Sequence, residues 1–416
     1  MIRPGQSLLH KLSPSQTEKL PADGKLTLAA RTIERLLKQL SAGYLVMTFP
    51  NGEQREFGAR SDSLHAEIRF HRWSAFQDIL RHGDIGFAEG YIRGDWDSPH
   101  LEKLLDLAVK NRNILERAIY GNWFGSLVYR FRHFLNRNNK TGSKKNIHAH
   151  YDLGNAFYRL WLDPSMTYSS AWFQADPNTS LELAQRAKYQ NILKSLALQP
   201  NSKVLEIGCG WGGFMEEAAL AGHQVTGLTL STEQQSFAID RLNHQWPNSH
   251  EVRLQDYRDC KDQFDGIASI EMFEAVGEQY WPMYFETISR CLKKNGKACI
   301  QTIVIAENLF DRYRKSTDFI QQYIFPGGML PSREAFKHYA QQAGLQIECE
   351  FAFGHDYAKT LCIWYEHFNH KLPEIRELGF DEPFIRLWNF YLLYCAAGFK
   401  QQNIDVVQFT LSHQPK

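Results

Sequence analysis

The run VLEIGCGWGGF, residues 204 to 214, constrains the fold more than any other part of the chain. Its first residues are apolar apart from Glu206 and predict a buried strand. The glycines that follow predict a turn and a helix start, because glycine permits positive φ and close backbone approach: Gly208, Gly210, Gly212 and Gly213. Their spacing fits the dinucleotide pattern G-x-G-x-x-G only loosely. A ligand pressed against the main chain and a purely structural turn therefore both remain open.

The stretches after the glycine run indicate which cofactor such a turn would hold. Residues 223 to 234 predict a second strand, and Thr229 stands where a nicotinamide-binding domain carries an acidic residue. A third short strand precedes Asp256, and residues 264 to 277 contain a fourth. Alternating strands and helices with ligand groups at the strand ends are typical of a doubly wound, Rossmann-like α/β domain. The order favours S-adenosylmethionine over a nicotinamide cofactor.

Composition excludes several classes of function. Lys and Arg total 47 against 46 Asp and Glu, so the chain as a whole has no electrostatic attraction to nucleic acid. The seven cysteines form no C-x-x-C pair, which argues against a zinc site and a disulfide framework and suits a reducing cytoplasm. No run approaches the roughly 18 apolar residues that a membrane-spanning helix needs. We expect no metal, and a protein that is soluble or peripheral to a membrane.

Three parts are predicted along the 416 residues. Residues 1 to 116 carry helix and hairpin patterns and predict a small α+β domain. Residues 117 to 149 contain seven Lys or Arg and no Asp or Glu, mixed with aromatic residues. This pattern is typical of an amphipathic segment at an anionic membrane surface, although a helix between domains with a solvated basic face fits it equally. Residues 150 to 416 form the predicted catalytic domain.

Six motifs in order resemble the cyclopropane fatty acid synthase and mycolic acid cyclopropane synthase family. They are HYDLGNAFYRLWLDPSMTYSSAWF, VLEIGCGWGG, VTGLTLSTEQ, FPGGMLPS, HDYAKTL and CAAGF. The upstream unit resembles the N-terminal domain of the bacterial members that act on phospholipids, and this resemblance adds the role of presenting lipid. The resemblance implies a methyltransferase that moves the activated methyl carbon of S-adenosylmethionine onto the cis double bond of a membrane lipid's acyl chain.

The same resemblance implies which residues hold the cofactor. Tyr151 and the pair Tyr168 and Ser169 should close over it, and Glu206 should face its positive charges, unless Glu206 only contacts the neighbouring main chain. The remaining residues fall into three groups. Gly208, Cys209 and Gly210 should pass beneath the methionine part, Thr229 and Gln234 should hold the ribose, and Gln255 and Asp256 should lie near the adenine.

The chemistry requires a base only after methyl transfer, when the carbocation left on the chain must lose a proton. Family members use a bound bicarbonate, and the residues that match its binding set are Ser170, Glu274, Gln301, the Ile303 backbone and Tyr391. Ser170 stands where the family usually has Cys, and Gln301 where it has His. Without a titrating imidazole, an anion site built from hydrogen bonds remains compatible with these residues.

Two further residues bear on this site. Glu271 adds a second carboxylate, which a helical turn would place on the same face as Glu274, and a solvent-exposed or capping role is the alternative. Cys395 matches the family's candidate catalytic cysteine, but its apolar surroundings are typical of an inert packing residue.

We therefore expect a cyclopropane-fatty-acyl-phospholipid synthase. Its partners would be an unsaturated phospholipid and the anionic inner face of the membrane, with no nucleic acid, and a homodimer is the assembly considered. One alternative is a fatty acid methyltransferase of the same family that leaves a methyl or methylene branch. Another is a lipid-binding carrier without chemistry.

Overall fold

The computed structural model describes residues 26–119, 153–176 and 178–415, which form two compact units. Neither unit is continuous along the chain. Unit 1 takes the described residues before 120 together with Lys315–Pro326 and Ile375–Gln401. Unit 2 takes the other described residues. The structure divides the described residues differently from the three expected parts, 1 to 116, 117 to 149 and 150 to 416, because two late segments belong with the N-terminal part.

Unit 1 contains a small sheet in the order β2-β1-β3-β4. The hairpin predicted around Asn51 and Gly52 is present, since β1 and β2 run antiparallel with Thr48 opposite Gln54. Strand β3 pairs with β1 in parallel, so the chain must cross over between β2 and β3. The strands are β1 (Tyr44–Thr48), β2 (Gln54–Gly58), β3 (His65–Phe70) and β4 (Trp96–Asp97).

Helices complete unit 1. Helix α17 contacts both α3 and α4, and Arg386 on α17 donates to the carbonyl of Tyr91 and, at 2.6 Å, to Asp97. Helix α3 is kinked at Gly83, where φ is 62°. The elements are α2 (Leu28–Leu37), α3 (Ser74–Arg93), α4 (Leu101–Lys110), α5 (Arg112–Ile119), the π-turn η4 (Ile320–Ile324) and α17 (Glu382–Lys400), while α16 (Leu372–Glu377) crosses from unit 2 into unit 1.

A buried cluster of charges lies near the end of α3. Arg93 pairs with Asp78 at 2.6 Å, with Asp95 at 2.7 Å and with Glu89 at 3.3 Å. All three carboxylate residues are buried, and the Arg93 side chain is only 12% exposed. Each carboxylate therefore depends on this guanidinium to offset the loss of water.

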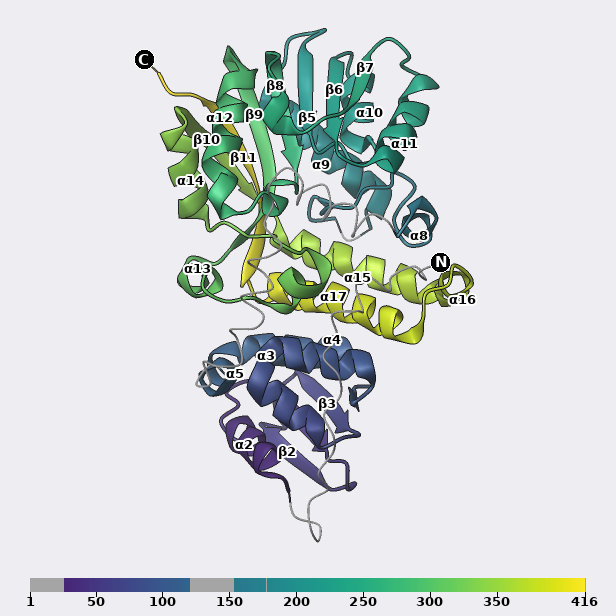
Figure 1. Ribbon diagram of the computed structural model, residues 1–416, viewed down its shortest axis with the longest axis vertical. Helices are drawn as coiled ribbons and strands as arrows, with labels where there is room; N and C mark the ends of the chain where they lie inside the picture. Colours follow the sequence, from purple (N-terminus) through teal and green to yellow (C-terminus); the bar gives the residue numbers. More distant parts are fainter. Residues whose placement is uncertain (1–25, 120–152, 177, 416) are drawn as a thin grey trace. The chain divides into compact units, whose positions relative to one another are not determined.

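Unit 2 is built on a seven-stranded sheet in the order β10-β11-β9-β8-β5-β6-β7 (Figure 1). Strands β7, β6, β5, β8 and β9 run parallel, which confirms the predicted Rossmann-like fold. Strand β11 runs antiparallel to both of its neighbours. The strands are β5 (Lys203–Ile207), β6 (Gln224–Thr229), β7 (His250–Leu254), β8 (Phe264–Ile270), β9 (Leu292–Ile305), β10 (Leu345–Ala352) and β11 (Ile404–His413).

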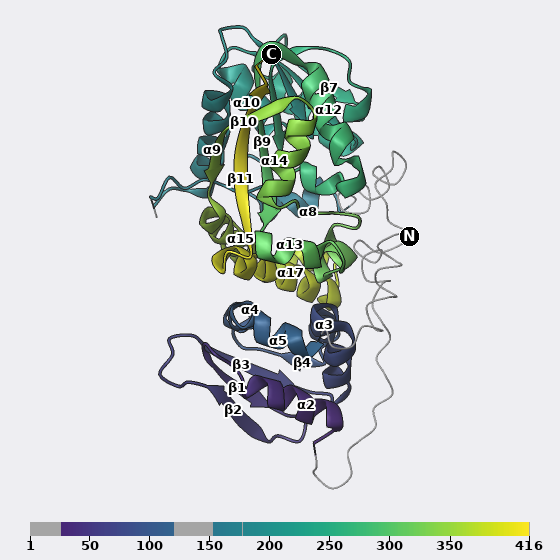
Figure 2. The same cartoon turned by 90° about the vertical axis from the view of Figure 1, so that its left-hand side faces the viewer.

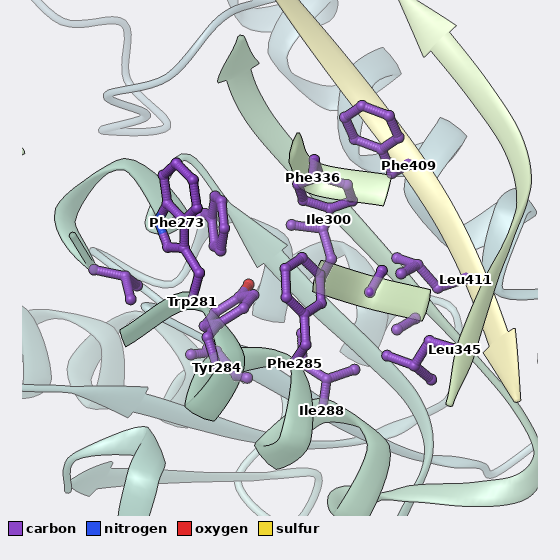
Figure 3. Close-up of a cluster of buried hydrophobic side chains, with 14 of the residues drawn as sticks. Phe273, Trp281, Tyr284, Phe285, Ile288, Ile300, Phe336, Leu345, Phe409 and Leu411 are labelled. Carbon is purple, nitrogen blue, oxygen red and sulfur yellow. The ribbon is translucent and has the colours of Figure 1, made fainter. Parts of the chain in front are cut away.

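Alternate residues of the strands enter two hydrophobic cores, one on each face of the sheet. Val204 lies in the core beneath α9, α10 and α11, whereas Leu205 lies in the core beneath α12 and α14. Figure 2 shows α9 and α14 on opposite sides of the strands. The second core is rich in aromatic rings, with Phe336 stacked on Phe409 at 4.1 Å (Figure 3). These helices are α9 (Leu181–Leu196), α10 (Gly213–Leu220), α11 (Thr232–Asn243), α12 (Trp281–Cys291) and α14 (Arg333–Gln342).

The remaining elements of unit 2 border the ends of the strands. They are α8 (Asn155–Arg159), α13 (Glu307–Tyr313), α15 (Gly354–His370) and the 3-10 turns η1 (Tyr257–Asp259), η2 (Phe273–Ala275) and η3 (Glu278–Tyr280). Of the helices that the structure describes, none is long and apolar enough to cross a membrane.

Candidate functional site

The described residues predicted to bind the cofactor lie mainly at the carboxyl ends of β5, β6 and β7, whereas Tyr168 and Ser169 precede α9. Strand β5 has β6 on one side and β8 on the other, so the strand order reverses beside it. In doubly wound folds this reversal opens the crevice in which ligands bind. The glycine run follows β5, and Glu271 follows β8 on the other side of the reversal.

The two glycines at the start of the glycine run have different uses. Gly208 has φ 81°, and its amide donates to the carbonyl of Leu228 at 3.0 Å, which ties the loop to β6. A Cβ there would come within 2.8 Å of Met272 Cγ. Gly210 also has positive φ, 50°, but a Cβ on it would meet no heavy atom within 4 Å. Gly210 therefore borders open space, as the cofactor prediction requires, whereas Gly208 is needed for close packing.

The residues predicted for the ribose and adenine are placed together. Thr229 donates its hydroxyl to Gln234 Oε1 at 3.0 Å, and both side chains are buried. The amide of Gln255 donates to the carbonyl of Thr229 at 3.0 Å. Asp256 caps η1 and accepts from the Arg258 guanidinium at 2.6 and 2.8 Å, so its charge is already offset by that pair.

Glu206 and Ser169 lie near a buried lysine that the motif analysis did not select. The Glu206 Oε2 atom is buried without a hydrogen-bond partner among the described residues, and burial raises the pKa of this carboxyl well above its usual range. Lys188 donates to Ser169 Oγ at 2.6 Å, and burial lowers its pKa to about 7. An unsatisfied acid beside the glycine run fits a positively charged cofactor. Tyr151 lies outside the described residues and Cys209 is buried, with its thiol pKa raised by burial.

Tyr168 lies in an aromatic cluster that the motifs did not predict. Its ring centroid is 5.5 Å from Tyr158, 5.6 Å from Trp161 and 5.4 Å from Trp364. Trp211 of the glycine run joins the cluster through Tyr158, at 5.1 Å. The cluster therefore fixes the segment before α9 against the cofactor loop.

Glu271 is the centre of the predicted anion site. Its Oε1 accepts from the Ser170 amide at 2.9 Å and from Gln301 Nε2 at 2.8 Å, and its Oε2 accepts from the Tyr357 hydroxyl at 2.5 Å. Ser170 and Gln301, which the family resemblance assigns to a bound anion, thus donate to the carboxylate of Glu271. Glu271 has φ 50°, so it is not helical and does not share a helix face with Glu274, contrary to the sequence-based expectation.

A chain of amides fixes the orientation of Gln301. Asn191 donates to Gln408 Oε1 at 2.7 Å, and Gln408 Nε2 donates to Gln301 Oε1 at 3.0 Å. Because Gln301 Oε1 already accepts, its Nε2 faces Glu271 as a donor. Gln408 stands directly opposite Gln301 across β11 and β9. No member of this chain titrates, so the donor to Glu271 is retained at every working pH.

Glu274 accepts the hydrogen bond of another member of the predicted anion-binding set, the Ile303 amide. Its Oε1 accepts from the Ile303 amide and, at 3.0 Å, from the Thr302 hydroxyl. Burial and then the charge of Glu271 raise the pKa of Glu274 to about 8. The pKa of Glu271 is also raised by burial, while Lys188 and the three donors lower it. Near neutral pH Glu274 is therefore largely protonated, while the donors around Glu271 favour its ionised form.

The residues present do not fit a bicarbonate ion. In the described part of unit 2, the donors of Ser170, Gln301 and Ile303 are directed at Glu271 and Glu274. A second anion there would displace these bonds and lie beside a like charge. The described residues also contain no group of three or more His, Cys, Asp or Glu that could hold a metal ion.

Two predicted catalytic residues lie in unit 1. Tyr391 and Cys395 are on α17, where Tyr391 contacts Trp388 and Phe325 at ring distances of 5.4 and 6.2 Å. Burial raises the pKa of the Cys395 thiol, as expected for a packing residue. The tyrosine that meets the carboxylate is instead Tyr357. The motif HDYAKTL contains Tyr357 and was the signal that could have identified it.

Comparisons with known proteins agree with the fold of unit 2. The family model described as mycolic acid cyclopropane synthetase matches residues 138–409. The chain is 36% identical over 398 residues to tuberculostearic acid methyltransferase UfaA1 of Mycobacterium tuberculosis, covering 93% of this chain and 92% of the relative. It is 35% identical over 361 residues to cyclopropane-fatty-acyl-phospholipid synthase of Escherichia coli K12, covering 85% and 90%. A solved structure of mycolic acid cyclopropane synthase CmaA1, complexed with SAH and CTAB, matches with a TM-score of 0.60 at 34% identity, covering 64% of this chain and 97% of that one.

Proposed function

The chain belongs to the mycolic acid cyclopropane synthetase family, and on that premise we propose that it converts a cis double bond of an unsaturated phospholipid acyl chain into a cyclopropane ring. It is an S-adenosylmethionine-dependent methyltransferase. The observation that carries the proposal is a carboxylate pair, Glu271 and Glu274, at the end of β8 across the strand-order reversal from the glycine run. That arrangement supplies a proton acceptor beside the glycine run.

S-adenosylmethionine supplies an activated methyl carbon when bound. An alkene is a neutral nucleophile, so the residues need not remove a proton before the transfer; they must hold the two groups in line and exclude water. Gly210 leaves room for the cofactor, and the cluster around Tyr168 provides apolar walls. The carbocation that forms on the acyl chain then needs a base.

A methyl-branched or methylene-branched product is the second candidate function. The relative covering 93% of this chain is named a tuberculostearic acid methyltransferase, a name without a ring. Gln301, which replaces the usual family His, donates its side-chain amide to Glu271, and the backbone amide of Ser170 donates to the same oxygen. A hydride shift before proton loss gives the methylene branch from the same cation, and a saturated methyl branch would then require a separate hydride donor. A carrier without chemistry is not retained, since the family consists of methyl-transferring enzymes.

Product analysis tests both functions. Purified protein is incubated with S-adenosylmethionine carrying a labelled methyl group and with vesicles of monounsaturated phospholipid, and the released acyl chains are identified by mass spectrometry. A cyclopropane and a methylene branch have equal mass, so a second aliquot is hydrogenated mildly, which adds two hydrogens only to the methylene product. A labelled chain of the cyclopropane mass that resists hydrogenation supports ring closure, because a saturated methyl branch would be two hydrogens heavier. A labelled chain that takes up two hydrogens supports the branched product. If no acyl chain is labelled, both proposed functions are contradicted.

We also propose that the enzyme works at the anionic inner face of the membrane. Support comes from the basic composition of residues 117 to 149, which lie outside the described residues except for 117–119. Each basic residue near such a surface contributes about 1 kcal/mol. Co-sedimentation with anionic vesicles should weaken when Arg130, Arg132, Arg137, Lys144 and Lys145 are neutralised together. Unchanged co-sedimentation would favour a helix between domains.

A further inference from the structure

We propose that the carboxylate of Glu271 is the built-in base of the reaction, in the position that the family resemblance gives to bicarbonate, and that the enzyme works without bicarbonate. The inference rests on the proposed acyl-chain methyl transfer. It concerns only the group that accepts the proton.

The hydrogen-bond donors that a bound bicarbonate would need are directed at Glu271. A bound bicarbonate would need donors converging on its oxygens, and here the Ser170 amide, the Gln301 amide and the Tyr357 hydroxyl converge on Glu271. They come from three separate parts of the chain, so their convergence is a property of the folded unit. A carboxylate has about four lone-pair directions, and three donors leave one for a proton.

The backbone at Glu271 supports the same assignment. Its φ of 50° lies in the left-handed region, which glycine adopts freely and a glutamate does not. The amide of Glu271 donates to the carbonyl of Gln301 at 2.8 Å, which holds this conformation at the end of β8. A strained, fixed backbone with a charged side chain is typical of a functional position rather than of a solvent-exposed residue.

The electrostatics separate the two neighbouring carboxyl groups. Three hydrogen-bond donors favour the ionised form of Glu271, and the nearby Lys188 favours it whenever its amine, with a pKa of about 7, is protonated. Glu274 accepts from the Ile303 amide and the Thr302 hydroxyl, and burial together with the charge of Glu271 raises its pKa to about 8. Glu271, on which three donors converge, is thus the member of the pair placed to accept a proton.

The bonds and charges balance with this base. As the methyl carbon bonds to one alkene carbon, its bond to sulfur breaks and the electron pair stays on sulfur, giving S-adenosylhomocysteine and a cation at the other alkene carbon. Glu271 then takes a proton from the transferred carbon, and the C–H electron pair forms the third bond of the ring. After a hydride shift, the same proton loss gives a methylene branch.

The test compares three proteins in CO₂-free buffer with and without sodium bicarbonate. Wild type should turn over equally in both. Glu271→Gln should lower kcat about 100-fold or more, the range of a lost general base, with no recovery on bicarbonate addition, because the amide still fills the site. Glu271→Gly should be equally slow in CO₂-free buffer and should recover at least about 10-fold with bicarbonate, since the glycine relieves the backbone and vacates the donors.

Folding and cofactor binding are controlled separately. Glu278→Gln makes the same chemical change on a surface residue that pairs with Arg314, and it should keep wild-type turnover. Each variant is checked for its affinity for S-adenosylhomocysteine by calorimetry.

The outcomes distinguish this inference from the proposed function. Wild type that releases no labelled product contradicts the methyl transfer itself. Wild type that turns over but stops in CO₂-free buffer overturns only the assignment of Glu271. Normal turnover of Glu271→Gln, or a glycine variant that no bicarbonate concentration reactivates, overturns it as well.

Discussion

Gln408 donates its amide to Gln301 at 3.0 Å from the directly opposing position on β11, and thereby decides which end of the Gln301 amide faces Glu271. Gln408→Leu removes this constraint. We expect kcat to fall about 5-fold, because a neutral hydrogen bond contributes about 1 kcal/mol, with little change in KM.

The pH profile of Gln408→Leu separates positioning from packing. The Gln301 hydrogen bond lowers the pKa of Glu271, so its loss should raise that pKa and move the acidic limb of kcat to higher pH. A fall in kcat at every pH with an unmoved limb would indicate a packing defect only.

Glu274→Gln should change how stability depends on pH. The folded-state pKa of Glu274 is about 8 against an ordinary 4.5, so the folded protein binds an extra proton between these values. This contribution is fully present below pH 4.5 and is lost as the pH rises through 8. The variant should therefore gain thermal stability relative to wild type as the pH rises from 5 to about 8.

Thermal melts of wild type, Glu274→Gln and the control Glu278→Gln across this range measure the effect. Since Glu274 is largely neutral at pH 7, Glu274→Gln should lower kcat by less than about 10-fold, a much smaller loss than that expected for Glu271→Gln. Parallel melting curves for wild type and Glu274→Gln would show that Glu274 is charged in the folded protein.

Gly210→Val should weaken binding of S-adenosylhomocysteine at least about 10-fold by filling the open space beside the loop. Gly222→Val is the matched control, because Gly222 also has positive φ and no neighbour within 4 Å. Gly208→Val should instead lower the melting temperature through its contact with Met272. Calorimetry that shows equal affinity for Gly210→Val and Gly222→Val would remove Gly210 from the cofactor site.

Arg93→Met should destabilise unit 1 by about 3–5 kcal/mol, because Asp78 and Glu89 would lose this arginine while buried. Asp95 would lose it too but would keep the longer 3.6 Å pair with Arg72. Arg376→Met is the control within the same unit. Arg376 pairs with Glu382 at 3.1 Å where both side chains are more than half exposed, and such pairs contribute about 0–1 kcal/mol. Denaturant unfolding gives both values, and equal losses would contradict the buried-cluster argument.

The sheet of unit 2 could be predicted because its signals are local. The apolar run before Gly208 and the glycines after it define a strand and a tight turn within a few residues. The same holds for the hairpin around Gly52. Strand β11 could not be oriented this way, because its direction depends on pairing with β9 and β10 rather than on its own apolar pattern.

The centre of the candidate site was harder to predict. Glu271 looks like one turn of a helix in the sequence, and only the fold brings it to Ser170, 101 residues away, and to Tyr357, 86 residues away. Tyr391 and Tyr357 both stand in late apolar segments, so sequence pattern alone could not decide between them. Motifs identify residue types, whereas the partners of a shared carboxylate are defined by contacts between segments that are far apart in the sequence.

The position of β11 has a consequence for how the protein is made. It follows every other strand of its sheet in the chain, yet it lies between β9 and β10 and is the described strand through which β10 joins the sheet. During synthesis, β5 to β9 can pair as they emerge from the ribosome, but β10 must wait. The chain must also traverse α17 of unit 1 before β11 is available. Because β11 carries Gln408, the hydrogen bond that orients Gln301 can form in unit 2 only when translation is almost complete. A shortened product that ends before β11 would therefore lack the contact that directs the Gln301 amide to Glu271.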